Sequence, residues 1–101
     1  MRTFIVFRKP GPAWVSGTAT RDQPGWDEHA RFMDVLHESD NVLLAGPYED
    51  LSRVLLIVRC SSSFEAEHLF DEDPWTQTGV LEMHGVHQWS AFLGPAGWPT
   101  A

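Results

Sequence analysis

The sequence predicts a single α+β domain whose elements follow the order βαββαβ. Three observations predict this order: four short apolar stretches of strand-like composition, two stretches with helical periodicity, and Gly- or Pro-containing breaks between them. The first and third strand-like stretches are apolar on both alternating faces, which is typical of the inner strands of a sheet. A chain of 101 residues is long enough for one such domain and no more.

The N-terminal strand is predicted over residues 3–8, which are mainly β-branched and aromatic. Several Pro and Gly residues in the following segment, 10–25, predict a long loop. A loop of this length is uncommon in a small domain and is often functional. This one carries Trp14 and Arg21 among several polar side chains, so it is a candidate part of a binding site.

A helix is predicted over residues 26–39, because apolar residues and two histidines recur there every three or four positions. Trp26, His29, Ala30, Met33, Leu36 and His37 are expected on one face, widened by Phe32 and Val35, with His37 near the surface and solvated. Residues 42–45 and 53–60 are predicted strands. The connection between them is short, so they are expected to form an antiparallel hairpin.

Ser62 stands three residues before Glu65, a capping-box pattern that predicts the start of a second helix. Pro74 predicts the end of this helix near Glu72, because the residue before a proline disfavours helical geometry. Residues 75–79 are predicted as a connection and residues 80–92 as the last strand. A single domain is thus predicted over residues 1–94, followed by an irregular tail over residues 95–101.

Two helices cover only one face of a four-stranded sheet. The other face of the predicted sheet also carries apolar residues, and no third helix is predicted to cover it. A large exposed apolar patch usually marks an interface between proteins. We therefore expect a homodimer, with further assembly left open.

Composition and motifs argue against several classes of protein. The net charge is −7 and no basic cluster occurs, so a nucleic-acid partner is not expected. The longest apolar run, residues 54–58, is too short to span a membrane. No signal-peptide pattern precedes the first strand and Cys60 is the only cysteine, so we expect a cytoplasmic protein. Without metal-ligand spacing or a Gly-rich nucleotide motif, neither a metal nor a cofactor is expected.

His29 is the first candidate for chemistry, because it lies in the middle of the predicted helix on its apolar face. A nearby carboxylate would hold the imidazole ring and favour its proton-accepting form. Asp73 is a candidate for this carboxylate, because Pro74 holds it in an extended conformation. The alternatives are a core histidine satisfied by the backbone and a solvated carboxylate in the acidic run 71–73. Spacing alone does not decide between them.

The segment from Arg21 to Met33 resembles the sequence around the helix-borne histidine of the YCII-related (YciI-like) family. Three further matches follow in the order that the family has them: Ala45-Gly46-Pro47, Asp73-Pro74-Trp75 and Val86 to Trp89. Together they cover about residues 2–94. Two departures are Asp22, where the most similar subgroup usually has Glu, and Asp40-Asn41, where a Gly is common.

The resemblance implies a ferredoxin-like fold, with a four-stranded antiparallel sheet and two helices on one face, assembled as a dimeric α+β barrel. It implies a His–Asp pair in a cleft, here His29 and Asp73, and it adds Gly46 and Pro47 to the candidate substrate-binding residues. One characterised relative eliminates chloride from a chlorinated hydroxyquinol without metal or cofactor, and the wider superfamily contains isomerases, cyclases and monooxygenases.

We therefore expect a cofactor-independent lyase or isomerase, dehydrochlorinase- or cyclase-like, acting on a small hydroxylated molecule that is cyclic or aromatic. His29 would be the general acid or base, Asp73 would orient it, and Arg21 would hold an anionic or enolate oxygen. A flat apolar pocket would be lined by Trp14, Trp26 and Trp75. Two alternatives are a non-catalytic dimeric binding or accessory module, without a His29–Asp73 hydrogen bond, and an interaction protein with no pocket.

Overall fold

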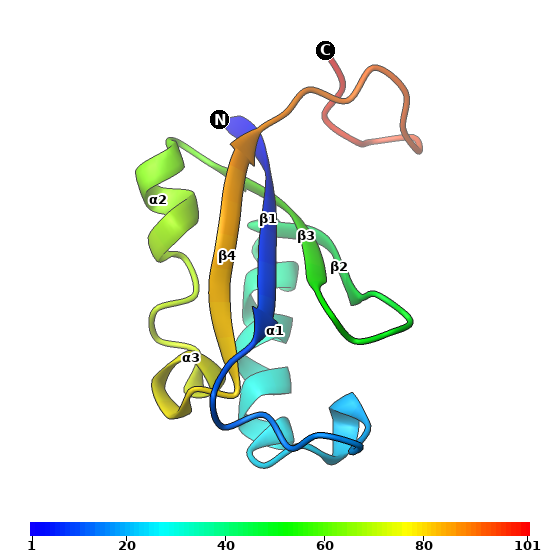
Figure 1. Cartoon of the computed structure of the whole chain (residues 1–101). Coiled ribbons are helices and arrows are strands. Elements are labelled where there is room, and N and C mark those ends of the chain that lie inside the picture. The colour runs from blue at the N-terminus through cyan, green and yellow to red at the C-terminus, as the bar shows by residue number, and fades with distance from the viewer.

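The computed structural model describes residues 1–101 and contains one antiparallel sheet of four strands (Figure 1). In chain order the strands are β1 (Arg2–Pro10), β2 (Val42–Pro47), β3 (Val54–Cys60) and β4 (Leu81–Gln88). Their order in the sheet is β2-β3-β1-β4, so β1 and β3 are the inner strands, as their apolar sequences predict. The predicted ferredoxin-like α+β fold is confirmed.

The helices pack against one face of the sheet. Helix α1 (Trp26–Glu38) lies against β2, while α2 (Ser63–His68) and α3 (Pro74–Thr78) lie beside β4 (Figure 1). The main core forms where the alternate residues of the strands meet α1, α2 and the turn after α2. It contains Phe4, Val6, Val42, Leu56, Val58, Cys60, Ala66 and Phe70. None of the helices is both long and apolar enough to cross a membrane.

The other face of the sheet has no helix over it, as the sequence predicts. Successive residues of a strand point to opposite faces. Ile5 is paired with Ile57 and Phe7 with Leu55, so these four side chains share the uncovered face. Leu44 pairs with Ile57 and extends this face onto β2, where its side chain is 54% exposed. We refer to Ile5, Phe7, Leu44, Leu55 and Ile57 as the open-face patch.

Several predicted boundaries are wrong, and the largest error concerns residues 74–78. They form helix α3, whereas the sequence pattern predicts a connection over residues 75–79. Pro74 occupies the first turn of this helix, a position that proline tolerates because the N–H there is unpaired in any case. Proline therefore starts a helix here as well as separating it from α2, which ends at His68 rather than near Glu72.

Smaller corrections concern the strand ends and one helix face. Strand β2 runs on to Pro47, which an edge strand permits, and β4 ends at Gln88 rather than near Phe92. Val35 is 64% exposed and lies outside the buried stripe of α1. The predicted N-cap of α2 is present, because the Ser62 hydroxyl accepts from the Glu65 N–H.

The long loop between β1 and α1 is fastened to the end of the sheet. It contains a short 3-10 helix, η1 (Thr20–Asp22), which the sequence analysis did not predict. The Gly11 N–H donates to the Val80 carbonyl and the Ala13 N–H to that of Gly79. A Cβ atom on Gly11 would lie 2.2 Å from the Gly79 oxygen, so only glycine permits this approach. The loop, α3 and the start of α1 thereby gather at one end of the sheet (Figure 1).

Candidate active site

A cavity of about 610 Å³ opens at this end of the sheet, between α1, the long loop and the strands. Its wall is mainly apolar, with a few polar groups, which is the usual character of a small-molecule site. It includes every predicted site residue except Asp73, which lies behind His29. The predicted residues in the wall are Trp14, Arg21, Trp26, His29, Gly46, Pro47 and Trp75.

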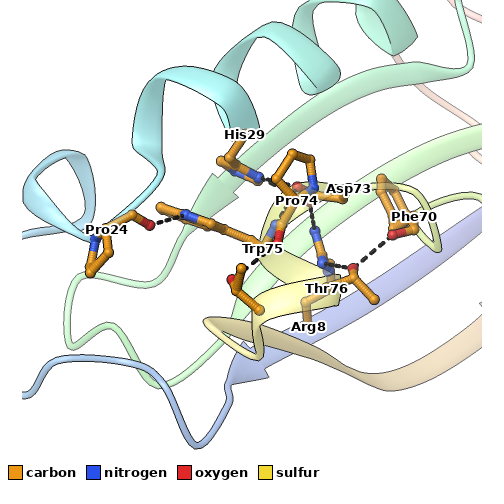
Figure 2. Close-up of polar contacts among 9 residues, drawn as sticks. Arg8, Pro24, His29, Phe70, Asp73, Pro74, Trp75 and Thr76 are labelled. Atoms are coloured by element: carbon orange, nitrogen blue, oxygen red, sulfur yellow. Dashed lines mark hydrogen bonds and ion pairs between the residues drawn. The ribbon is translucent and has the colours of Figure 1, made fainter.

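His29 and Asp73 are in direct contact. The Nδ1 atom of His29 lies 2.9 Å from both carboxylate oxygens of Asp73 (Figure 2). An ionised carboxylate can only accept hydrogen bonds, so Nδ1 carries the hydrogen and donates it. Asp73 is 0% exposed and His29 is 8% exposed. Because Nδ1 is engaged and His29 lines the cavity, Nε2 is the ring nitrogen available to a bound molecule.

Asp73 is aimed at His29 by the start of α3. It is the N-cap residue of this helix, and its Oδ1 atom accepts from the Trp75 N–H at 3.0 Å. An N-cap aspartate normally satisfies an unpaired N–H of the first helical turn in this way. Pro74 keeps Asp73 extended, at ψ 126°, as the sequence analysis expected. The local sequence thus contributes to the orientation of the carboxylate through the N-cap bond and the following proline.

Trp75 supports the other side of the pair. Its indole ring stacks on the imidazole of His29, with ring centroids 3.9 Å apart and planes within 7°. The indole N–H donates to the Pro24 carbonyl at 2.7 Å, which ties α3 to the start of α1 (Figure 2). Trp26 lies 5.7 Å from both rings and Trp14 packs edge-on against Trp75. The three predicted tryptophans therefore form one aromatic cluster around His29.

Arg8 completes the polar network and was not among the predicted site residues. It is 1% exposed, and its Nη1 atom donates to Asp73 Oδ2 at 2.7 Å (Figure 2). Its Nη2 atom donates to the Thr76 hydroxyl, which in turn donates to the Phe70 carbonyl. A signal for Arg8 exists in the sequence, because its position alternates with those of Phe4 and Val6 and therefore shares their buried face.

The network controls the charge of Asp73. Burial by itself raises the pKa of this carboxyl, since a low-dielectric environment disfavours the charged form. Hydrogen bonds from His29, Arg8 and the Trp75 N–H outweigh burial, and together they hold the pKa of Asp73 below its ordinary value of 3.8. Burial lowers the pKa of Arg8, opposed by its contact with Asp73. An arginine nevertheless stays protonated in proteins, so Arg8 and Asp73 form a buried ion pair.

Gln23, another residue that the sequence analysis did not select, shapes the loop above the cavity. It is 2% exposed, its Oε1 accepts from the Val15 N–H, and its Nε2 donates to the carbonyls of Val15 and Thr18. These three bonds close the loop on itself. Arg21 lies on η1, with its guanidinium carbon 6.0 Å from the centre of the Trp26 ring, at the cavity wall.

The remaining ionisable candidates lie apart from the network. His68 pairs with Asp71 at 2.8 Å, but both side chains are at least half exposed and neither lines the cavity. Cys60 is fully buried in the main core, as expected of a small apolar side chain. Asp34 on α1 is exposed and lies at the wall of the cavity. No three His, Cys, Asp or Glu side chains come together in a group that could hold a metal ion.

Comparison with known proteins gives two matches. A family described as the YCII-related domain matches residues 3–90. A solved structure, 5-chloro-2-hydroxyhydroquinone dehydrochlorinase from Burkholderia phenoliruptrix AC1100 in complex with 2,5-dihydroxybenzoquinone, superposes with a TM-score of 0.61. The alignment covers 88% of this chain and 94% of the other at 21% identity, which shows a shared fold. No curated protein sequence matches the chain.

Proposed function

The chain belongs to the YCII-related domain family, and we propose that it is a cofactor-independent lyase or isomerase that uses His29 as its acid–base group. The observation that carries the proposal is the arrangement of His29, with Nδ1 held by a buried carboxylate and the ring at the wall of a 610 Å³ cavity. This is the geometry of an oriented general base, because the tautomer and ring position are set by the second residue.

The cavity wall indicates the class of substrate. The indoles of Trp14, Trp26 and Trp75 offer flat apolar surfaces, which suit a planar ring. The guanidinium of Arg21 is a cation that would stabilise an oxygen gaining negative charge. A small cyclic or aromatic molecule with ionisable hydroxyl groups meets both requirements. The dehydrochlorinase with the same fold acts on such a molecule, which supports the proposal.

In the proposed reaction the unprotonated Nε2 of His29 removes a proton from a hydroxyl group or an acidified carbon of the substrate. Asp73 accepts the Nδ1 hydrogen bond throughout and stabilises the imidazolium that forms. The electron pair left on the substrate then either expels a leaving group as an anion, giving elimination, or is reprotonated at another atom, giving isomerisation. In elimination His29 then gives its proton to water, so the substrate has lost a proton and the leaving group. In isomerisation His29 returns the same proton to the substrate.

A non-catalytic binding module would use the same cavity without acid–base chemistry. That hypothesis predicts a pocket in which His29 and Asp73 are not hydrogen-bonded, whereas their atoms lie 2.9 Å apart. The contact therefore favours the catalytic hypothesis.

The proposal is tested by turnover and binding with two named compounds. Chloride release from 5-chloro-2-hydroxyhydroquinone measures elimination, and quenching of tryptophan fluorescence by 2,5-dihydroxybenzoquinone measures occupancy of the cavity. We expect His29→Gln to lower kcat/KM by about 100- to 10,000-fold while binding of the quinone changes little.

His68→Gln is the matched control, because His68 also contacts an aspartate but lies at the surface. It should turn over at the wild-type rate. Wild-type turnover by His29→Gln would contradict the role of His29. Quinone binding without turnover in the wild type would favour the binding module.

We further propose that a second copy of the chain covers the open-face patch. The patch is apolar, continuous across β2, β3 and β1, and not covered by a helix. Leu44 is exposed, Ile5, Phe7 and Leu55 are half-buried, and Ile57 is 9% exposed. A second copy would bury it in a symmetric interface, which is the commonest arrangement of homodimers.

Light scattering during size-exclusion chromatography should give twice the mass of the 11.4 kDa chain. We expect Leu44→Glu to shift the protein to a monomer, because it places a charge in the patch. Val35→Glu is the control, since Val35 is also an exposed apolar residue but lies on α1, away from the patch. A wild-type protein that stays monomeric at tens of micromolar would contradict the dimer.

A further inference from the structure

Arg8 has no assigned role in the proposed reaction, yet it is among the most buried side chains of the protein. Its Nε atom is buried without a hydrogen-bond partner. A buried ion pair is seldom more stabilising than well-packed apolar residues, and an unpaired buried donor adds a further cost. The geometry of the site supplies a reason for an arginine at this position.

The guanidinium of Arg8 is held rigidly. Its two terminal nitrogens are anchored by Asp73 and Thr76, and its central carbon lies 5.0 Å from the centre of the Phe70 ring. Asp73 is in turn held by three groups: Arg8, His29 and the Trp75 N–H. The carboxylate therefore cannot rotate away from His29 without breaking a buried ion pair. Arg8 therefore holds Asp73 in the position from which Asp73 orients His29.

Arg8 also sets the charge of the cluster. Arg8 and His29 Nδ1 both contact the same oxygen of Asp73, at 2.7 and 2.9 Å. One positive and one negative charge already cancel, so the buried cluster is neutral only when the imidazole is neutral. Without Arg8, the cluster would be neutral only when His29 is protonated, because the imidazolium would then balance the charge of Asp73. By Coulomb's law the guanidinium thus opposes protonation of His29.

The other groups around His29 are few. The cavity wall adds one cation, Arg21 on η1, and one carboxylate, Asp34 on α1. The segments contributed by β2 and β3 carry no charge. The stacked ring of Trp75 attracts a cation weakly and so acts against Arg8, but it carries no net charge. Arg8 and Asp73 therefore dominate the local field.

We infer that Arg8 is a positioning residue, which locks Asp73 in place and keeps His29 in its neutral Nδ1–H form, so that Nε2 begins the reaction as a base rather than as an acid. This inference rests on the proposed function, because it concerns the same histidine. It specifies the order of proton transfer: the substrate loses a proton to His29 before it receives one.

The test follows the protonation of His29 directly and needs no substrate. Nitrogen-15 NMR of the histidine rings is recorded against pH on the whole chain, with His29→Gln used to assign the signals. Arg8→Gln and Arg8→Lys both lose the pair of hydrogen bonds that Arg8 donates to Asp73 and Thr76. Only the lysine keeps the positive charge.

In Arg8→Gln we expect the midpoint of His29 protonation to rise above that of the wild type, with a smaller change in Arg8→Lys. Arg59→Met is the control, because Arg59 bonds the neutral Thr3 hydroxyl away from the site. It should leave the titration unchanged. Equal titration curves for the glutamine and lysine variants would overturn the inference.

Asp73→Asn keeps the test decisive if Arg8→Gln does not fold. Added to Asp73→Asn, Arg8→Gln removes the remaining buried charge, so the double variant holds no uncompensated ion at this position. We expect the midpoint of His29 protonation to be higher in the double variant than in Asp73→Asn alone, and equal midpoints would overturn the inference. Loss of turnover plays no part in either readout, so failure of the proposed reaction remains distinguishable.

Discussion

Arg8 and Lys9 are neighbouring cations of strand β1, but one lies on the buried face of the sheet and the other on the exposed face. Arg8 points to the helix-covered face, where it meets Asp73 at 2.7 Å with both side chains at most 1% exposed. Lys9 points to the open face, where it lies 3.5 Å from Glu82 with side chains 40% and 46% exposed. One step along the chain therefore separates a buried, hydrogen-bonded ion pair from a solvated one.

The difference shows which charges of this protein act electrostatically on neighbouring groups. Water screens the pair of Lys9 and Glu82, so the effect of either charge on its neighbours weakens as salt is added. The pair of Arg8 and Asp73 is excluded from water, so each charge acts on every group that it touches, including His29. The same strand thus provides the framework of the candidate active site on one face and a candidate interface on the other.

The largest expected effect comes from breaking the buried pair. Asp73→Asn leaves Arg8 buried without a counter-charge and should lower the free energy of unfolding by about 3–5 kcal/mol at pH 7. Because the pKa of Asp73 is lowered in the folded protein, its contribution is present above the ordinary value of 3.8 and is lost as the pH falls below it. The two proteins should therefore converge in stability in acid.

Urea unfolding at pH 7 and pH 3 measures this convergence, with the exposed Asp71→Asn as control. An Asp73→Asn protein with the same dependence on pH as the wild type would show that the carboxylate gains no stability from its ionisation.

A second comparison uses two phenylalanines of β1. Phe4 is 1% exposed in the main core, whereas Phe7 lies half-buried in the open-face patch. Phe4→Ala should cost about 3–5 kcal/mol. Phe7→Ala should cost less in the monomer, about 1–2 kcal/mol, because part of the ring is already in contact with water and less apolar surface is lost. Thermal unfolding at low protein concentration separates the two. Equal losses would mean that Phe7 is buried by an interface that persists at that concentration.

The smallest effect is expected from the solvated pair. Glu82→Gln should change the free energy of unfolding by about 0.5 kcal/mol or less, and added salt should remove the difference. A double-mutant cycle with Lys9→Met measures the coupling between the two charges. A coupling of several kcal/mol would show that the open face is shielded from water, and it would extend the proposed interface to this end of the strand.

Much of the fold was predictable because it depends on local patterns. The apolar runs of β1 and β3 identified them as inner strands, and the periodicity of residues 26–39 placed His29 on the buried face of α1. Helix α3 was missed because it has only five residues, too few to show a period, and because its proline also signals the end of a helix. Its boundaries depend on contacts with α1 and β4.

The candidate site was predictable only in part. Histidine on an apolar helix face and an aspartate held by a following proline are features of the sequence, and both were selected. Arg8 was passed over although alternation with Phe4 and Val6 places it inside, because an arginine at the end of a strand usually reaches solvent. Gln23 was passed over because an amide in a polar loop carries no pattern that distinguishes it.

The sequence by itself determined that β1 and β3 are inner strands and that β2 and β3 form a hairpin, and therefore the order of the sheet, since the alternation of strand side chains follows from the backbone alone. Only the tertiary structure decided that Asp73 meets His29, 44 residues away, and Arg8, 65 residues away. Such contacts arise where separate elements pack together, and no local period records them. The sequence thus supplied the fold and the candidate residues, and packing joined them into a charged network.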